Sequence, residues 1–280
     1  MRIVVTGAGG GLGRAFLDVV SGGGTEHEVH AFTHAELDIG DPQAVRRTIP
    51  PLEPELLLNA AAFTDVDGCE RDPQRAIRDN ADGPRSLALA ADEVGAVMLH
   101  LSTDYVFDGE KGAPYDERDE PAPQSVYARS KLEGENRVRE TTELHLIVRT
   151  GLVFGAGDDY ASSSLGRLAK GKEAGGLVDR WGTPTYVRHL AARLLPLVAS
   201  DELGTFHLGG PERATWFDVF TRAKALGNLP GTVAAQRFDD LPLIATRPRD
   251  SSLTSVRLPE LPIEPMPPLD VAIREHLASL

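Results

Sequence analysis

The sequence predicts an α/β fold: a Rossmann-like doubly wound parallel sheet with a smaller, interleaved C-terminal substrate-binding region. Three observations support this class. Short apolar runs alternate with helical patterns in the first half, a glycine loop follows the first run, and the alternation becomes irregular after Gly151. Strands that alternate with helices favour a parallel sheet, because each helix carries the chain back to start the next strand in the same direction.

Five strands are expected in the first half. Their runs are short and rich in apolar residues: 3–6, 28–32, 56–59, 97–102 and 144–150. The helical patterns between them cover 12–20, 41–48, 80–94 and 126–141. Asp41 followed by Pro42 is typical of a helix cap and a first helical residue, which supports the second of these helices.

The second half has fewer strand signals. Its expected helices lie near 163–169, 187–199 and 216–226, with a closing amphipathic helix from Leu269 onward and one strand at 205–208. We therefore expect residues 1–150 to form a dinucleotide-binding Rossmann domain. Residues 151–280 are expected to be mainly a substrate-binding region, with some segments returning to the Rossmann core.

Composition excludes several classes of protein. The chain has 280 residues, of which 41% are hydrophobic and 25% charged, so a large core is expected. No apolar run approaches the roughly 20 residues of a membrane helix, and the first strand begins at Arg2, so we expect a cytoplasmic protein. A net charge of −13 argues against nucleic-acid and membrane partners. The single Cys69 is read as a packing residue.

A glycine loop separates the first strand from the first helix. Gly7 permits a tight turn, Gly10 lets the backbone approach a pyrophosphate, and Gly13 allows close packing of helix and strand. An ordinary strand-to-helix turn is the alternative, but the elements on both sides favour a nicotinamide cofactor. The spacing TGxxGxxG is typical of the short-chain dehydrogenase superfamily.

The segments that follow the second and third strands are expected to complete the cofactor site. Phe32-Thr33-His34 lacks the acidic residue that often contacts the NAD ribose, so NADPH is expected at least as readily as NADH. His34 or Arg14 could approach a 2′-phosphate, and Asp38-Ile39 could meet the adenine. The small residues after Asn59, which are Ala60, Ala61 and Ala62, either leave room for the cofactor or permit close helix packing.

Thr103, Tyr127 and Lys131 are the candidate catalytic residues. A spacing of four places Tyr127 and Lys131 on one face of a helix, one turn apart. Tyr127 can donate a proton to a carbonyl oxygen as hydride arrives, while Lys131 holds the cofactor ribose and lowers the phenol pKa. Thr103, at the end of a strand, can hydrogen-bond the same oxygen.

With these motifs in place, the chain resembles the dTDP-4-dehydrorhamnose reductase family of the extended short-chain dehydrogenases. The resemblance runs nearly end to end and is carried by residues 59–67, 102–109, 127–135, 148–155, 182–186 and 247–253. It implies reduction of the 4-keto group of a dTDP-linked 6-deoxy sugar to give dTDP-L-rhamnose, with NADPH or NADH. A nucleotide-sugar partner follows, and a homodimer is one option for the assembly.

Transferred by position, the resemblance implies proton donation from Tyr127, support from Lys131, and substrate contacts near Thr103 and Asp104. It also implies cofactor contacts at Gly10, Gly11, Leu12, Asp38, Ile39, Ala60, Ala61 and Ala62. Some family members use magnesium, but no spacing of His, Asp or Glu here suggests a metal site.

Several positions depart from the family pattern. Gly11 stands where the family commonly has Gln, and Arg180 also replaces a Gln. Leu152 stands where the family usually has a Trp that lines the substrate pocket, so a stacking surface is lost and space is opened. Arg247, together with Arg249, could bind a diphosphate, and solvated loop arginines are the alternative. A different nucleotide-linked keto sugar is therefore an alternative substrate.

Two further alternatives stay open. The fold also resembles the regulatory beta subunit of methionine adenosyltransferase, which suggests a non-catalytic NADP-binding subunit. A short-chain epimerase or dehydratase is less favoured, because Asp104-Tyr105 supplies only one carboxylate beside Thr103. Outside these motifs, His207 is read as a structural histidine. The acidic stretch 116–120 is read as a solvated loop, whose position between Thr103 and Tyr127 would let it border the active site.

Overall fold

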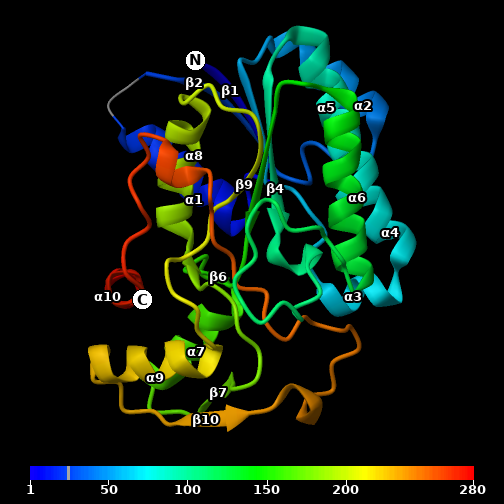
Figure 1. Cartoon of the computed structure of the whole chain (residues 1–280). Coiled ribbons are helices and arrows are strands. Elements are labelled where there is room, and N and C mark those ends of the chain that lie inside the picture. The colour runs from blue at the N-terminus through cyan, green and yellow to red at the C-terminus, as the bar shows by residue number, and fades with distance from the viewer. Residues whose placement is uncertain (24–25) are drawn as a thin grey trace.

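One parallel sheet organises the molecule, whose computed structural model describes residues 1–23 and 26–280 (Figure 1). The strand order is β2-β1-β3-β4-β5-β9. The strands are β1 (Arg2–Thr6), β2 (Glu28–Phe32), β3 (Leu56–Asn59), β4 (Val97–Thr103), β5 (His145–Thr150) and β9 (Gly204–His207). Because the chain leaves β1 first toward β2 and later returns to β3 on its other side, the order reverses there. Such a reversal opens a crevice at the carboxyl ends of the strands.

Helices cover both faces of this sheet. On one face lie α1 (Gly11–Gly22) and α8 (Val187–Val198); on the other lie α2 (Pro42–Thr48), α5 (Gly83–Val94) and α6 (Val126–Thr141) (Figure 1). Ile3 and Val5 pack with the first pair, whereas Val4 between them packs with the second group, as the two-residue period of a strand requires. The predicted Rossmann-like class is confirmed.

A smaller unit lies below the carboxyl edge of the sheet in Figure 1. Its helices are α7 (Tyr160–Ala169), α9 (Trp216–Gly227) and α10 (Leu269–Ala278). Two short parallel pairs accompany them: β6 (Val153–Phe154) with β8 (Thr185–Tyr186), and β7 (Ala174–Leu177) with β10 (Val233–Gln236). Phe154, Leu165, Phe220 and Ile273 build its separate core. The chain passes between the units repeatedly, since α8 and β9 return to the large sheet.

Most predicted elements occur within a few residues of their expected bounds, and α6 matches them fully. Asp41 caps α2 as expected, accepting hydrogen bonds from the backbone N–H groups of Gln43 and Ala44 at 2.9 and 3.1 Å. The prediction missed the two short strand pairs of the smaller unit. It also missed two short helices, α3 (Val66–Arg71) and α4 (Pro73–Ile77). It also placed the start of α5 too early, because the π-helical turn η2 (Arg78–Asp82) precedes it. Such short segments contain too few residues for a periodic pattern.

Within the described residues, no helix is long and apolar enough to cross a membrane. The same residues contain no group of three or more His, Cys, Asp or Glu side chains that could hold a metal ion.

The Asp41 cap provides a test of local stability. Replacement by Ala removes the acceptor for two N–H groups, and we expect the free energy of unfolding to fall by about 1 kcal/mol. Asp92→Ala, at an exposed position in α5, is the matched control and should leave stability unchanged or slightly raised. Chemical denaturation of both variants is the measurement, and equal stability of Asp41→Ala and the unmodified protein would contradict the role of the cap.

Candidate active site

The glycine loop closes against the end of β3. Gly7 has a φ of +74°, and a Cβ there would lie 2.5 Å from the backbone of Ala60 and Ala61. At Gly13 a Cβ would come within 2.8 Å of the Cα of Ala8, so the first turn of α1 packs directly on the loop. Only glycine tolerates both the left-handed conformation and these approaches. A side chain at Gly11 would meet Ala156, whose Cα would be 3.1 Å from the new Cβ.

A cavity of about 370 Å³ lies beside this loop. Most of the predicted cofactor-binding residues line it, and Gly9, His34 and Leu37 lie beside them. Arg75 and Asp79 also line the cavity, although the sequence did not indicate them. The predicted positions that line it are Gly7, Gly10, Asp38, Ile39, Ala60, Ala61 and Ala62. Leu12 and Gly13 lie in the first turn of α1, and Gly11 lines a different cavity on the side of Ala156. The loop, the small residues and the helix N-terminus suit the diphosphate and adenosine of a dinucleotide.

Buried hydrogen bonds hold the wall formed by the three alanines. Asn59 Oδ1 accepts from Thr6 Oγ1 at 2.9 Å and from the backbone N–H of Ala61 at 3.0 Å. Asn59 Nδ2 donates to His100 Nδ1 at 3.0 Å. Asn59 is fully buried, so these partners satisfy polar atoms that would otherwise be costly to bury. The turn after β3 is therefore held in one position.

Charged residues surround the far end of the cavity. Arg78 pairs with Asp38 and donates through Nη1 to Asp79 Oδ1 at 2.6 Å. Arg75 Nε lies 3.2 Å from Asp79 Oδ2, and its guanidinium stacks 4.1 Å from the ring centre of Phe63. The pairing with Arg78 contributes to holding the Asp38 pKa below its usual value, although burial alone would raise it. Asp38 is thus an anchored anion at the expected adenosine position.

Two expectations about the 2′-phosphate need correction. Nothing near Thr33 was expected to repel a phosphate, but the Glu36 carboxylate accepts from the Thr33 N–H at 2.9 Å and from its hydroxyl at 2.7 Å. Arg14 was a candidate phosphate ligand, but it donates to the carbonyls of Gly9 and Ala156, the latter at 2.9 Å. Arg14 therefore fastens the glycine loop to the segment after β6.

Thr103 lies at the end of β4 in a hydrogen-bonded chain. Its hydroxyl donates to Asp104 Oδ1 at 3.0 Å and accepts from the backbone N–H of Tyr105 at 3.2 Å. Asp104 accepts a second hydrogen bond from the hydroxyl of Ser251, which comes from the C-terminal region. Burial raises the pKa of Asp104 to about 6, against the lowering effect of these hydrogen bonds. The absence of a side chain at Gly151 provides the space for the Asp104 carboxyl group, since a Cβ at this position would collide with it.

Tyr127 lies next to this chain in the first turn of α6. Its ring meets Tyr105 edge-on, with ring centres 6.2 Å apart. Lys131 and the charge of an oxidised nicotinamide are together expected to lower the phenol pKa, and the protein's own groups act against that effect. Burial raises the pKa strongly, a hydrogen bond with Thr103 works in the other direction, and the negative charge of Asp104 adds to the increase. Tyr127 therefore keeps its proton at neutral pH.

Lys131 is 3% exposed, and its Nζ donates to the carbonyl of Leu101 at 2.6 Å. Burial lowers its pKa to about 8, while the charge of Glu135 acts in the opposite direction. The ammonium group is therefore directed at the backbone of β4, two residues before Thr103. The structure brings the predicted Thr, Tyr and Lys to one edge of the sheet.

The predicted substrate residues come from segments far apart in sequence. Leu152 has a φ of +44°, and a Cβ at Gly182 would come within 2.8 Å of its side chain, so the two residues face each other closely. Arg247 Nη1 donates to Asp67 Oδ1 and to the carbonyl of Ala245, both at 3.1 Å.

Phe238 and Arg180, which the sequence did not single out as site residues, adjoin Arg247. The guanidinium of Arg180 lies 4.1 Å from the ring centre of Phe238 and that of Arg247 lies 5.8 Å from it. Arg180 Nε is buried and has no hydrogen-bond partner within residues 1–23 and 26–280. A hydrogen bond and the positive charge of Arg247 act on Tyr105, whose pKa burial raises to about 12. Arg247 therefore connects Arg180 and Phe238 to Tyr105, whose ring packs on Tyr127.

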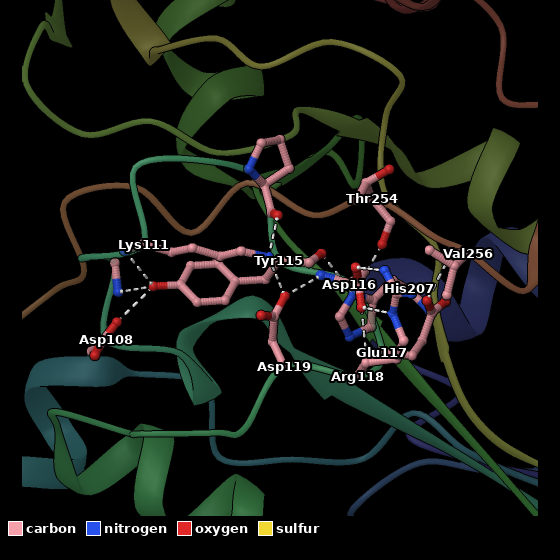
Figure 2. A network of polar contacts seen from close by, with 12 residues as sticks. Asp108, Lys111, Tyr115, Asp116, Glu117, Arg118, Asp119, His207, Thr254 and Val256 are labelled. Atoms are coloured by element: carbon pink, nitrogen blue, oxygen red, sulfur yellow. Dashed lines mark hydrogen bonds and ion pairs between the residues drawn. The ribbon is translucent and has the colours of Figure 1, made fainter.

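A polar network attaches the loop after β4 to the sheet edge (Figure 2). The Glu117 carboxylate accepts from the backbone N–H groups of His207 and Val256, at 2.9 and 3.0 Å. His207 Nδ1 donates to the carbonyls of Tyr115 and Thr254, which confirms a structural histidine. Reading 116–120 as merely a solvated loop was wrong, because Glu117 joins β9 to the segment after Ser251. The network thus holds in place the C-terminal segment that includes Ser251, whose hydroxyl contacts Asp104.

The sheet, its switch-point cavity and the adjoining Thr, Tyr and Lys place the protein in the short-chain dehydrogenase class of nicotinamide-dependent oxidoreductases. The family model of the RmlD substrate binding domain matches residues 1–280. The chain belongs to this family.

Named relatives are similar over nearly the whole chain. The dTDP-4-dehydrorhamnose reductase of Mycolicibacterium smegmatis is 36% identical, with 100% of this chain and 86% of that protein covered. A solved dTDP-4-dehydrorhamnose reductase from Clostridium acetobutylicum is 33% identical with a TM-score of 0.95, covering 100% and 99%. The reductase of Bacillus anthracis, solved in complex with NADP, is 28% identical with a TM-score of 0.94 and the same coverage.

Glu36 provides a test of cofactor preference. Removing its charge with Glu36→Gln should reduce repulsion of the 2′-phosphate, so the ratio of NADPH to NADH affinity is expected to rise by roughly three- to tenfold. Glu260→Gln, an exposed position in η5 (Leu258–Glu260), removes a distant charge and is the control. Titration of both cofactors is the measurement, and an unchanged ratio would place Glu36 too far from the 2′ position.

Proposed function

We propose that this protein reduces the 4-keto group of a nucleotide-linked 6-deoxy sugar with NADPH or NADH, and that the substrate is dTDP-4-dehydro-L-rhamnose. The observation that carries the proposal is the arrangement of Thr103, Tyr127 and Lys131 at the carboxyl edge of a sheet that also carries a glycine-lined cavity; Thr103 and Lys131 are buried and Tyr127 is half-buried. Relatives named dTDP-4-dehydrorhamnose reductase and the neighbour that holds NADP support the same reaction. A non-catalytic cofactor-binding subunit would have no chemical need for a protonated phenol beside Thr103.

The cofactor residues each have a defined task. The glycine loop and the N-terminus of α1 bind the diphosphate, the alanines after Asn59 border the nucleotide, and Asp38 lies at the adenosine end. Lys131 binds the nicotinamide-side ribose through its ammonium group. The nicotinamide, when bound, supplies the hydride for the carbonyl carbon.

Proton transfer is the part that the protein supplies. Tyr127 holds its proton at neutral pH, and the proton can pass to the carbonyl oxygen as hydride arrives and negative charge develops there. Thr103 orients that oxygen through its hydroxyl. Asp104 is mostly ionised above pH 6 and keeps the Thr103 side chain in place. The Tyr127 and Thr103 side chains thus lie where negative charge develops, and the Thr103 hydroxyl would turn from Asp104 to donate to the carbonyl oxygen.

We assign the substrate nucleotide mainly to residues 151–280, apart from the catalytic residues of the sheet. Arg180 and Arg247 carry positive charge beside Phe238, in a protein whose net charge is −13. Guanidinium groups bind diphosphate oxygens through paired hydrogen bonds, and an aromatic ring can stack on a base. Leu152 borders the sugar, where it leaves more room than an indole ring.

The substrate assignment is tested by following NADPH oxidation with dTDP-4-keto-L-rhamnose, with other nucleotide-linked 4-keto sugars, and without sugar. Rapid oxidation with formation of dTDP-L-rhamnose is expected. Oxidation only with another keto sugar would replace the substrate, and tight NADPH binding with no turnover of any sugar would favour the regulatory-subunit alternative.

Tyr127→Phe tests the proton donor. The variant keeps the ring that packs on Tyr105 but loses the acidic proton, so kcat should fall by about 10²- to 10⁴-fold with little change in NADPH affinity. Tyr160→Phe, in the smaller unit, removes a hydroxyl that donates to the Gly175 carbonyl and should retain activity. Steady-state kinetics measure both variants, and full turnover by Tyr127→Phe would exclude the assigned role.

The lowered pKa of Lys131 predicts a pH dependence of cofactor binding. Its folded-state pKa is about 8, so the charged form dominates below pH 8 and is lost as pH rises through this value. NADPH affinity should therefore decrease on the alkaline side, and Lys131→Met should remove this decrease together with most of the affinity. Fluorescence titrations of NADPH at a series of pH values provide the measurement; a constant affinity through this range would contradict the ribose role.

A further inference from the structure

Helix α6 presents a third ionisable residue on the face that carries Tyr127 and Lys131. Glu135 follows Lys131 by four residues, so the three side chains are stacked one turn apart. Glu135 is 0% exposed. A fully buried carboxylate is strongly unfavourable unless paired charges and hydrogen bonds compensate for the loss of water.

Three partners surround this carboxylate. Arg149 of β5 donates through Nε and Nη2 to its two oxygens, at 2.9 and 2.7 Å. Arg139 Nη2 donates to Oε2 at 2.6 Å, and the hydroxyl of Ser102 in β4 donates to Oε1 at 2.5 Å. The two-pronged contact with Arg149 is the strongest geometry available to such a pair. Glu135 thereby ties α6 to the carboxyl ends of β4 and β5.

We propose that Glu135 is a positioning residue of this site: the Arg149–Glu135–Arg139 cluster fixes α6 against β4 and β5 and keeps Lys131 charged and directed at the end of β4. The proposal deepens the function assigned above and rests on it for the role of Lys131. Glu135 itself touches neither cofactor nor substrate.

The location of the cluster supports this role. Lys131 Nζ contacts the carbonyl of Leu101, the residue directly before Ser102, which contacts Glu135. A shift of α6 relative to β4 would therefore change both contacts together. Arg149 also lies 3.4 Å from His207 Nε2, so the cluster is continuous with the network of Figure 2. The carboxyl edge of β4 and β5 thus contacts the helix that carries Lys131, and through His207 it is also connected to the C-terminal segment that contacts Asp104.

The charges around Lys131 agree with the proposal. Burial lowers the pKa of the ammonium group, and the negative charge of Glu135 opposes that effect. Although burial alone would raise the pKa of Glu135, the hydrogen bonds and charge of Arg149 lower it, so the carboxylate is ionised. His100 on β4 is neutral, because burial and the charges of Lys131 and Arg139 keep its pKa well below the usual value.

Other ionisable groups belong to the elements packed against α6. They are His145 and Arg149 of β5, His100 of β4, Asp104 and Tyr105 of η3 (Asp104–Val106), Asp67, Cys69, Glu70 and Arg71 of α3, Arg75 of α4, Arg78, Asp79 and Asp82 of η2, and Arg85, Asp92 and Glu93 of α5. Asp82 pairs with Arg137 on α6, and Glu70 accepts from the Val126 N–H at the start of the helix. The negative charge that raises the Lys131 pKa is that of Glu135.

The test compares Glu135→Gln with Glu135→Asp. Gln preserves the size of the side chain and removes its charge, whereas Asp preserves the charge and shortens the side chain. NADPH affinity is measured against pH without any sugar, so the result does not depend on the identity of the substrate. We expect the alkaline loss of affinity in the Gln variant to move to lower pH by about half to one unit, and that in the Asp variant to stay near pH 8.

Glu133→Gln is the matched control. Glu133 lies on the same helix and pairs with Arg137 at 2.8 Å, but it is 42% exposed, so its removal should leave the pH profile unchanged. A folded Glu135→Gln protein with the original profile would overturn the proposal, and so would equal shifts in the Gln and Asp variants, which indicate a purely structural role.

Loss of one partner can prevent folding, because Arg149 would be buried without its counterion. If Glu135→Gln does not fold, the double variant Glu135→Gln with Arg149→Gln removes both charges and is measured in the same way. If the double variant loses NADPH affinity at a lower pH than the unmodified protein, the proposal is supported. If it loses affinity at the original pH, the proposal is overturned. Loss of sugar turnover with an intact NADPH pH profile in the unmodified protein would instead reject the proposed reaction and leave the Glu135 test in force.

Discussion

The position of the whole site depends on a sheet that is buried on both faces. Inside its central strands the side chains are apolar and almost fully enclosed, as Val4, Leu57 and Leu99 are. Most polar side chains of these strands lie near the carboxyl ends, with the buried His100 of β4 as an exception, and Thr6, Asn59 and Thr103 are terminal residues of their strands. Because parallel strands end at one edge, residues more than 90 positions apart in sequence meet there. The topology brings the cofactor cavity and the proton donor together.

Helix α6 connects that edge to the rest of the molecule through buried polar contacts. Asn80 Nδ2 donates to Ser130 Oγ and to the carbonyl of Phe63, and its Oδ1 accepts from the Phe63 N–H at 2.8 Å. Gly134 allows the close approach, since a Cβ there would collide with the Asn80 carbonyl. One amide thus joins the turn after β3 to the helix that carries Tyr127. A displacement of the turn after β3 or of α6 would therefore also displace Tyr127 relative to the cofactor cavity.

Local signals explain which parts of this arrangement the sequence could predict. The glycine loop, the Asp41 cap and the four-residue spacing of Tyr127 and Lys131 each depend on residues close in the chain, and the structure places them as expected. Glu117 and Phe238 were missed because their partners are distant: Glu117 binds the backbone near residues 207 and 256. The effect of burial on the Tyr127 pKa could not be predicted for a related reason, since burial is set by packing and not by spacing.

The buried polar groups of the site also set the protonation state of the proton donor. Asp104 has a pKa of about 6, so at neutral pH it is mostly an anion that accepts the Thr103 proton. Its negative charge raises the pKa of Tyr127 and discourages a phenolate, the form that alcohol oxidation requires from this residue. Tyr127 therefore holds its proton until hydride is transferred, and Lys131, one turn further along α6, supplies the positive charge that can stabilise the phenolate formed when the proton leaves. A carbonyl oxygen entering between Tyr127 and Thr103 would receive the Tyr127 proton, and it would receive a hydrogen bond from Thr103 once that hydroxyl turns away from Asp104.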